Sequence, residues 1–139
     1  MATIGTWNFP DELAYTAEHI WVRVEGGEAT IGLSSFGQEL AGQIVFVEAP
    51  RVGRQVAAGE PFMSLESGKW VGRVKAIVTG KITQANEELE WEAALINQDP
   101  YGGGWFAKVE LAEPPAGLLK ASDPDYAAYI AGERAKYGK

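Results

Sequence analysis

The chain has 139 residues, of which 46% are hydrophobic, so it is long and apolar enough for one domain with its own core. Its formal net charge of −7 argues against a nucleic-acid partner, because this surface would repel the phosphates. There is no cysteine, which excludes disulfides, zinc–thiolate sites and thiol nucleophiles.

The first predicted element is a strand within residues 15–24. Apolar side chains alternate there at Ile20, Val22 and Val24, which is typical of a strand with one buried face. A turn rich in glycine follows and leads into further apolar residues. This part of the chain therefore predicts two short strands joined by a turn.

A short helix and another strand are predicted next. Ser34 and Ser35 can cap a helix over residues 36–41, and Gly42 is placed to end it. Residues 43–49 then form a β-rich run that stops at a proline. The chain therefore returns to strands after one short helix.

The most informative segment is a predicted exposed turn between two strands. An apolar run over residues 61–65 precedes it, and a ragged, half-buried pattern over residues 71–76 follows. Gly68 can adopt the positive φ of a tight hairpin, which would place Lys69 at the tip with its amine in water. That geometry suits the attachment of a long swinging cofactor, although a plain solvated lysine gives the same local pattern. The turn consists of Glu66, Ser67, Gly68, Lys69 and Trp70.

A C-terminal helix is predicted over about residues 123–136. A Ser-Asp pair before Pro124 is a typical helix start, with the proline in the first turn. Tyr126, Tyr129 and Ile130 then follow at helical spacing. We expect this helix to cover one edge of the strands.

Several motifs follow one another in order along most of the chain, from residue 15 to residue 111. They include Tyr15-Thr16-x-Glu18-His19-x-Trp21-Val22, Gly42-x-Ile44-Val45-Phe46-Val47-Glu48-x-Pro50 with Val52-Gly53, Ala58-Gly59-Glu60, Glu66-Ser67-x-Lys69, Gly80 with Asn86-x-x-Leu89, and Leu95-Ile96-Asn97-x-Asp99-Pro100-Tyr101-Gly102-x-Gly104-Trp105. Each motif is weak alone. The ordered set resembles the H protein family of the glycine cleavage system, lipoyl-carrying relatives of the lipoyl and biotinyl domains.

The resemblance implies a mainly β fold, a flattened two-sheet β-sandwich (a lipoyl/biotinyl-type barrel-sandwich hybrid) with short helices and a C-terminal helix. It implies one lipoyl-carrier domain over residues 1–139, with its core at about 15–111. It also implies that lipoic acid is bound to Lys69 through an amide, with Glu66, Ser67, Gly68 and Trp70 as the flanking recognition turn. Such a protein is a carrier and not an enzyme, because its arm only moves intermediates between the active sites of other proteins.

The surroundings of the lysine depart from the family pattern. The family usually has a small aliphatic residue before the lysine and a small residue after it, whereas here these are Gly68 and Trp70. Val71-Gly72-Arg73 replaces the polar or acidic stretch that typically follows. These departures favour a second branch of the family, the lipoate-binding proteins of microbial sulfur oxidation, which work with a heterodisulfide-reductase-like complex. The first alternative is the H protein of glycine cleavage itself, which carries the aminomethyl group. The second alternative is an interaction module with the same fold that is never lipoylated.

The partners follow from these alternatives. Either carrier needs a lipoate–protein ligase or a lipoyl transferase, and the glycine cleavage alternative adds glycine decarboxylase, aminomethyltransferase and dihydrolipoamide dehydrogenase. A biotin carrier would need methionines beside the lysine, which are absent here. No run of the sequence has the length and apolarity of a membrane helix and none resembles a secretory signal, so we expect a cytoplasmic protein without membrane contact.

No catalytic or metal-binding residue is predicted. His19 is the only histidine, and its spacing indicates no nucleophile or acid partner, so we interpret it as a packed residue near the arm surface. The acidic segment over residues 87–92 is interpreted as a solvated face. Packing roles in the core or between sheets are assigned to Trp7, Trp21, Trp91 and Trp105.

Overall fold

The computed structural model describes residues 2–4, 7–9, 13–16, 19–68, 71–113, 119–120 and 124–137. Its helices are α1 (Ser35–Ala41), α2 (Leu95–Gln98), α3 (Pro124–Tyr137) and the 3-10 helix η1 (Glu87–Glu90). Its strands are β1 (Ala2–Ile4), β2 (Trp7–Phe9), β3 (Ala14–Tyr15), β4 (Ile20–Glu25), β5 (Glu28–Leu33), β6 (Ile44–Glu48), β7 (Gln55–Val56), β8 (Pro61–Ser67), β9 (Val71–Lys75), β10 (Gly80–Ala85), β11 (Ala107–Leu111) and β12 (Leu119–Lys120).

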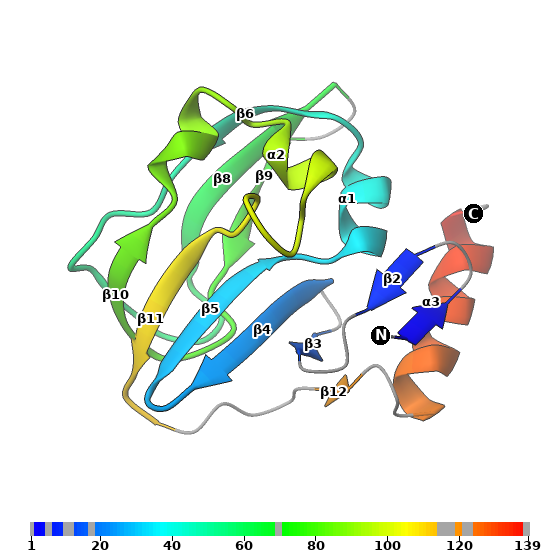
Figure 1. The fold of residues 1–139 in the computed structure, drawn as a ribbon, viewed down its shortest axis with the longest axis horizontal. Coiled ribbons are helices and arrows are strands. Elements are labelled where there is room, and N and C mark those ends of the chain that lie inside the picture. Colours follow the sequence, from blue (N-terminus) through cyan, green and yellow to red (C-terminus); the bar gives the residue numbers. More distant parts are fainter. Residues whose placement is uncertain are drawn as a thin grey trace.

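The strands form two main antiparallel sheets. Seven strands follow the order β12-β3-β4-β5-β11-β10-β7, and three strands follow the order β6-β8-β9. In Figure 1 the three-stranded sheet lies behind β5 and β11, and α3 stands on the opposite side of the molecule from β10. Strands β1 and β2 form a separate pair. The predicted mainly β, flattened two-sheet sandwich is confirmed.

The main core lies between the two sheets. Ile31 on β5 and Val109 on β11 share one hydrophobic cluster with Val47 on β6 and Leu65 on β8, and each is at most 2% exposed. Side chains of successive strand residues point to opposite faces, so these residues mark the inward face of each sheet. Burial of apolar surface between the sheets is therefore the main force that holds them together.

A second, aromatic cluster covers the other face of β3 and β4. Its fully buried members are Leu13, Tyr15, Trp21, Phe36, Tyr126 and Ile130, contributed by the β3–β4 region, α1 and α3. The rings of Tyr15 and Tyr126 are stacked with centroids 5.2 Å apart. Helix α3 therefore packs against the outside of the seven-stranded sheet, where its tyrosine and isoleucine side chains are buried.

The observed burial contradicts two predictions. Ile20, Trp21 and Val22 are all buried because β4 is covered on both faces, whereas Val24 near the end of the strand is 44% exposed. The predicted alternation of buried and exposed side chains along β4 is therefore wrong. Trp91 is 71% exposed, so its predicted packing role is also wrong. The side chain of Trp7 lies outside the described residues.

The predicted short helix is confirmed as α1. The Ser34 hydroxyl accepts a hydrogen bond from the Gly37 N–H at 3.1 Å, which caps the first turn. Gly42 ends the helix with φ 82°, a conformation that a residue with a Cβ adopts only with strain. The helix thus turns the chain from β5, in the large sheet, into β6, in the small sheet.

Candidate functional site

The predicted lysine turn joins β8 to β9 at one end of the three-stranded sheet. The last pair of the β8–β9 ladder is Glu66 with Val71, so four residues make the connection. Lys69 and Trp70 lie outside the described residues. The predicted place of Lys69 at the tip of the turn therefore stays a prediction. The ladder nevertheless restricts the connection to the end of a hairpin, because both of its flanks are fixed by pairing.

The described part of the turn is open to solvent. Gly68 is exposed, and a Cβ built on it would meet no atom within 4 Å. Its φ lies outside the left-handed region, so the positive φ predicted for it is wrong. A connection of four residues can reverse the chain without that conformation, which the prediction had tied to a tight hairpin. Glu66 is also exposed, whereas Ser67 is 6% exposed and points inward.

An exposed apolar surface lies beside the turn on the outer face of this sheet. Phe46, Glu66 and Val71 are register partners across β6, β8 and β9, so their side chains share one face. The exposed fraction is 49% for Phe46 and 73% for Val71. Val45 is 61% exposed as well, because a bulge between Ile44 and Phe46 adds one residue to β6.

Sequence reasoning missed this surface. Residues 44–47 form a continuous apolar run, which gives no signal for the face that each side chain takes. The bulge makes the pattern buried, exposed, exposed, buried instead of alternating. Only the pairing of β6 with β8 shows that two of these side chains point to solvent.

Asn97 on α2 fixes the strand that flanks the turn. Its Oδ1 accepts a hydrogen bond from the Ile44 N–H at 2.8 Å, and its Nδ2 donates to the Gly42 carbonyl at 2.8 Å and to Gln38 Oε1 at 3.0 Å. Ile44 in turn pairs with Ser67, the residue before Gly68. The side chain therefore connects α1, α2 and the base of the lysine turn, a role that its place in the motif did not reveal.

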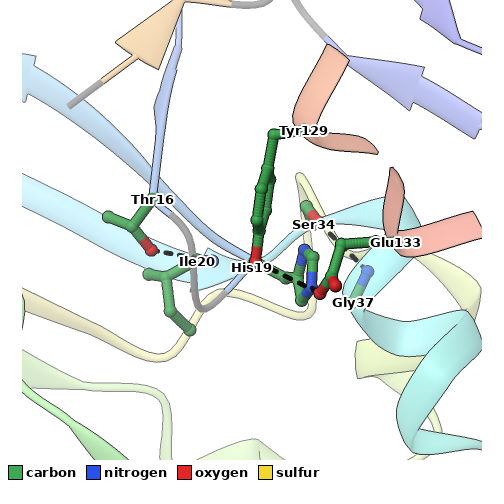
Figure 2. A network of polar contacts seen from close by, with 7 residues as sticks. All are labelled: Thr16, His19, Ile20, Ser34, Gly37, Tyr129 and Glu133. Carbon is green, nitrogen blue, oxygen red and sulfur yellow. Dashed lines mark hydrogen bonds and ion pairs between the residues drawn. The ribbon is translucent and has the colours of Figure 1, made fainter. Parts of the chain in front are cut away.

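His19 is a packed residue that joins the loop before β4 to α3. Its Nε2 lies 3.1 Å from Oε1 of Glu133, and the Tyr129 hydroxyl donates to the same oxygen at 3.1 Å. Figure 2 shows the three side chains converging between β4 and α3. His19 is 8% exposed, has φ 67°, and makes an edge contact with Phe36. These contacts favour the structural interpretation of this histidine over a catalytic one.

The remaining predictions of sites concern charged groups and the membrane. Glu87, Glu88, Glu90 and Glu92 are exposed, which confirms the solvated acidic face. Among the described residues, no group of three or more His, Cys, Asp or Glu side chains could hold a metal ion. Within the same part of the chain, no helix is both long and apolar enough to cross a membrane.

Comparison with known proteins gives one consistent family. The family model described as "Glycine cleavage H-protein" matches residues 13–131. A glycine cleavage system H protein of Herpetosiphon aurantiacus is 44% identical over 129 residues, which are 93% of this chain and 98% of the relative. One from Rubrobacter xylanophilus is 46% identical over 106 residues, which are 76% of this chain and 84% of the relative.

A solved structure agrees with these sequences. The crystal structure of a glycine cleavage system H protein from Mycobacterium marinum superposes with a TM-score of 0.78 at 34% identity, and covers 90% of this chain and 98% of that one. Each of these relatives is similar to this chain along most of its length. None of them supports the sulfur-oxidation branch that the surroundings of the lysine favoured, and they favour the glycine cleavage alternative instead.

Proposed function

This chain belongs to the glycine cleavage H-protein family, and on that premise we propose that it is the H protein of a glycine cleavage system, with its lipoyl group on Lys69. Members of the family are non-catalytic carriers of a lipoyl group bound covalently to a lysine. The predictions of a lipoyl cofactor and of a carrier rather than an enzyme are thereby confirmed. The assignment to Lys69, the pathway and its partners are the proposal.

The observation that carries the proposal is the position of the lysine turn. Paired strands fix both flanks of the turn, and a Cβ built on Gly68 would meet no atom of the described residues within 4 Å. In this proposal the paired strands form the base of the connection, and the amine of Lys69 is the group that is acylated. Tethering raises the effective concentration of a carried group at each partner's active site, so that transfer no longer depends on diffusion of a free intermediate.

The described residues fit a long arm at this position. Gly68 in the turn is exposed, and an apolar surface formed by Phe46 and Val71 lies on the adjoining sheet face. A lipoyl group on Lys69 would supply the two sulfur atoms, one of which would hold the aminomethyl group during transfer. In this proposal the chain contributes the paired β8–β9 hairpin, the attachment point and the surfaces that partners recognise. The expected partners are glycine decarboxylase, aminomethyltransferase and dihydrolipoamide dehydrogenase.

We also propose that residues 1–139 form one carrier domain, with the core at about 15–111 and a C-terminal helix. The support is that α3 shares its aromatic cluster with β3, β4 and α1, which also contribute to the sandwich. The cytoplasmic location stays a prediction.

The test is a mass measurement followed by an exchange assay. We expect intact protein from its native host to carry one lipoyl group on the peptide that contains Lys69, and the Lys69→Arg variant to carry none. The lipoylated protein should support exchange of the glycine carboxyl carbon by glycine decarboxylase. The unlipoylated variant should lose that activity entirely and keep the melting temperature of the wild type.

Two results would contradict the proposal in different ways. An unmodified Lys69, in cells whose other lipoyl proteins are modified, would favour the non-lipoylated interaction module. A lipoylated protein that supports no exchange, yet copurifies with a heterodisulfide-reductase-like complex, would favour the sulfur-oxidation branch. In that case Arg73, which is exposed on the same sheet face, would be the first residue to vary.

A further inference from the structure

We propose that an open hollow beside the loop after β6 is a binding site for a small organic phosphate. The hollow has a volume of about 830 Å³, which is in the range of small-molecule sites. We name it the arginine hollow, and its lining includes Glu48, Arg51, Val52, Gly53, Arg54 and Phe62. The inference goes beyond the proposed function, because it does not depend on lipoylation of the chain.

A β-turn brings the two arginines of the hollow together. The Arg51 carbonyl accepts a hydrogen bond from the Arg54 N–H at 3.3 Å, and Gly53 has φ 91°, as the third residue of a type II turn requires. The Cα atoms of the first and fourth residues of such a turn lie less than about 7 Å apart. Both arginine side chains therefore reach the same hollow from neighbouring positions.

The turn is fixed to the large sheet by its backbone. The Gly53 N–H donates to the Ile82 carbonyl at 2.8 Å, and the Ile82 N–H donates to the Arg54 carbonyl at 2.9 Å. Ile82 on β10 is fully buried, so these bonds tie the loop to a strand of the core. Figure 1 shows the connection after β6 passing beside β10. The loop is thus ordered before any ligand binds, which lowers the entropic cost of binding.

No described residue neutralises the two guanidinium groups. Both arginines are exposed, and neither forms an ion pair within the part of the chain that the structure describes, although Glu48 lines the same hollow. Arg54 donates from one terminal nitrogen to the Pro61 carbonyl at 3.1 Å, which orients its side chain and leaves its other donors for a ligand. Two neighbouring cations repel each other, and an anion bound between them offsets that repulsion.

The lining of the hollow favours a phosphate ester over other anions. A phosphate dianion matches the charge of two guanidinium groups and accepts hydrogen bonds from both, whereas one carboxylate is satisfied by a single arginine. The exposed side chain of Val52 and the buried ring of Phe62 provide an apolar wall. Glu48 accepts hydrogen bonds from hydroxyl or amino groups and repels a second phosphate. The ligand class is therefore a monophosphate on a body that carries both an apolar part and hydroxyl groups.

The hollow lies at the other end of β6 from the lysine turn. Ser67, at the base of that turn, pairs with Ile44, the first residue of β6, whereas the hollow begins at Glu48, the last residue of the strand. A phosphate bound there leaves the lysine turn uncovered. We therefore expect the Lys69→Arg protein to bind the ligand as the wild type does.

The first experiment is a titration of isotope-labelled protein with AMP, followed by NMR. AMP carries a monophosphate, hydroxyl groups and a flat base, and about 0.15 M salt screens the attraction between distant surface charges. We expect saturable shifts of the amides of residues 51–54, with a Kd below about 1 mM. Arg51→Gln and Arg54→Gln should each raise this Kd about tenfold, because each removes charge-assisted hydrogen bonds. Arg73→Gln, at an exposed arginine outside the hollow, is the matched control and should leave the Kd unchanged.

The second experiment compares ligands and uses Glu48→Ala. AMP should bind about tenfold more tightly than inorganic phosphate, because its base also contacts the apolar wall. Malonate, a carboxylate dianion, should bind more weakly than inorganic phosphate. Glu48→Ala should tighten the binding of inorganic phosphate, since it removes a negative charge, and should reduce the preference for AMP. Melting temperatures of the variants without ligand should stay close to the wild type, because the substituted side chains are exposed.

Four results would overturn the inference, and none of them affects the proposed function. Shifts that rise with AMP without saturating would show that the protein has no site for it. If Arg51→Gln and Arg54→Gln bind AMP as tightly as Arg73→Gln does, the hollow is not where AMP binds. Equal affinities for AMP and inorganic phosphate would show that no organic body is recognised. Malonate that binds as tightly as inorganic phosphate would show that the hollow does not select phosphate. Conversely, an unmodified Lys69 would contradict the proposed function and leave AMP binding as it is.

Discussion

The outer faces of the two sheets differ in how far other elements cover them. The outer face of β3 and β4 is sealed by α3 and α1, and Trp21 there is fully buried. The outer face of β6, β8 and β9 remains open, and Val71 there is 73% exposed. A face that is covered contributes stability, whereas a face that is left open contributes little stability and is available to partners. The covered face that stabilises the fold is thus separate from the open face beside the β8–β9 connection.

The largest effect is expected at the sealed face. Trp21→Ala should lower the free energy of unfolding by about 3–5 kcal/mol, because it removes a fully buried ring. It also leaves the Pro100 carbonyl without the hydrogen bond that Nε1 donates at 2.8 Å. Urea unfolding monitored by circular dichroism measures the loss. The matched control is Trp91→Ala, which removes the same side chain from a position that is 71% exposed and should cost little.

A second variant checks the packing of that ring independently. Trp21 lies across Gly32, its register partner on β5, and a Cβ on Gly32 would stand 2.6 Å from the ring. Gly32→Ala should therefore destabilise the protein, although alanine is small. Equal stability of the Trp21→Ala and Trp91→Ala proteins would contradict the distinction between a sealed and an open face.

The next effect concerns the link between the two regions. Asn97→Ala should cost about 2–3 kcal/mol, because three hydrogen bonds are lost and the Ile44 N–H loses its acceptor. Since Ile44 pairs with Ser67, amide hydrogen exchange should also become faster at the base of the lysine turn. Gln98→Ala, an exposed neighbour on α2, is the control and should change neither quantity. Unchanged exchange at Ser67 in the Asn97 variant would show that the turn does not depend on this link.

Local chemistry explains which parts of the fold could be predicted. The cap by Ser34 and the helix end at Gly42 depend on residues that are neighbours in sequence, and both predictions are confirmed. The burial of both faces of β4 could not be predicted from residues that are neighbours in sequence. Its second face is covered by Tyr126 and Ile130, more than a hundred residues further along the chain, so that the alternation ending at Val24 gave a false signal.

The candidate site also has one part that the sequence predicted and another that it did not. The lysine turn was predicted because a turn between two strands is a local pattern, and the register of β8 with β9 agrees with it. The exposure of Phe46 depends on a bulge, and the role of Asn97 depends on a partner 53 residues away. An apolar run does not show which of its side chains are exposed, and a single asparagine does not show which backbone groups it binds. Pairing between distant strands decides both, and one sequence does not contain that information.

A smaller effect is expected at Tyr101, which packs against the aromatic cluster. Its hydroxyl accepts a hydrogen bond from the Ser35 N–H at 2.9 Å, so Tyr101→Phe should cost about 1 kcal/mol at neutral pH. Burial raises the pKa of Tyr101 from 10.0 to about 12, and the hydrogen bond from Ser35 opposes this only in part. The unfolded chain loses this proton first, so the stabilisation is complete below pH 10 and is lost as the pH rises through 12.

The pH profile of stability measures this contribution. Between pH 10 and 12 the wild type should lose up to about 3 kcal/mol through Tyr101, and Tyr101→Phe should flatten that part of the curve. It should not abolish the slope. Burial also raises the pKa of Tyr126, with further increases from Tyr101 and Tyr129, so this second tyrosine acts in the same direction. Identical alkaline slopes for the two proteins would contradict the burial of this hydroxyl.

The smallest effect is expected on the open face, where two valines of β9 make the comparison within one strand. Val74 faces the core and is 7% exposed, whereas Val71 is 73% exposed. Val74→Ala should cost roughly 1–3 kcal/mol, and Val71→Ala should change stability by less than about 0.5 kcal/mol. If both cost the same, the outer face would be covered in the free protein, and a concentration-dependent melting temperature would identify a second copy as the cover. A near-zero cost at Val71 would instead mean that folding does not need this apolar side chain at the surface, so that only a partner could make use of it.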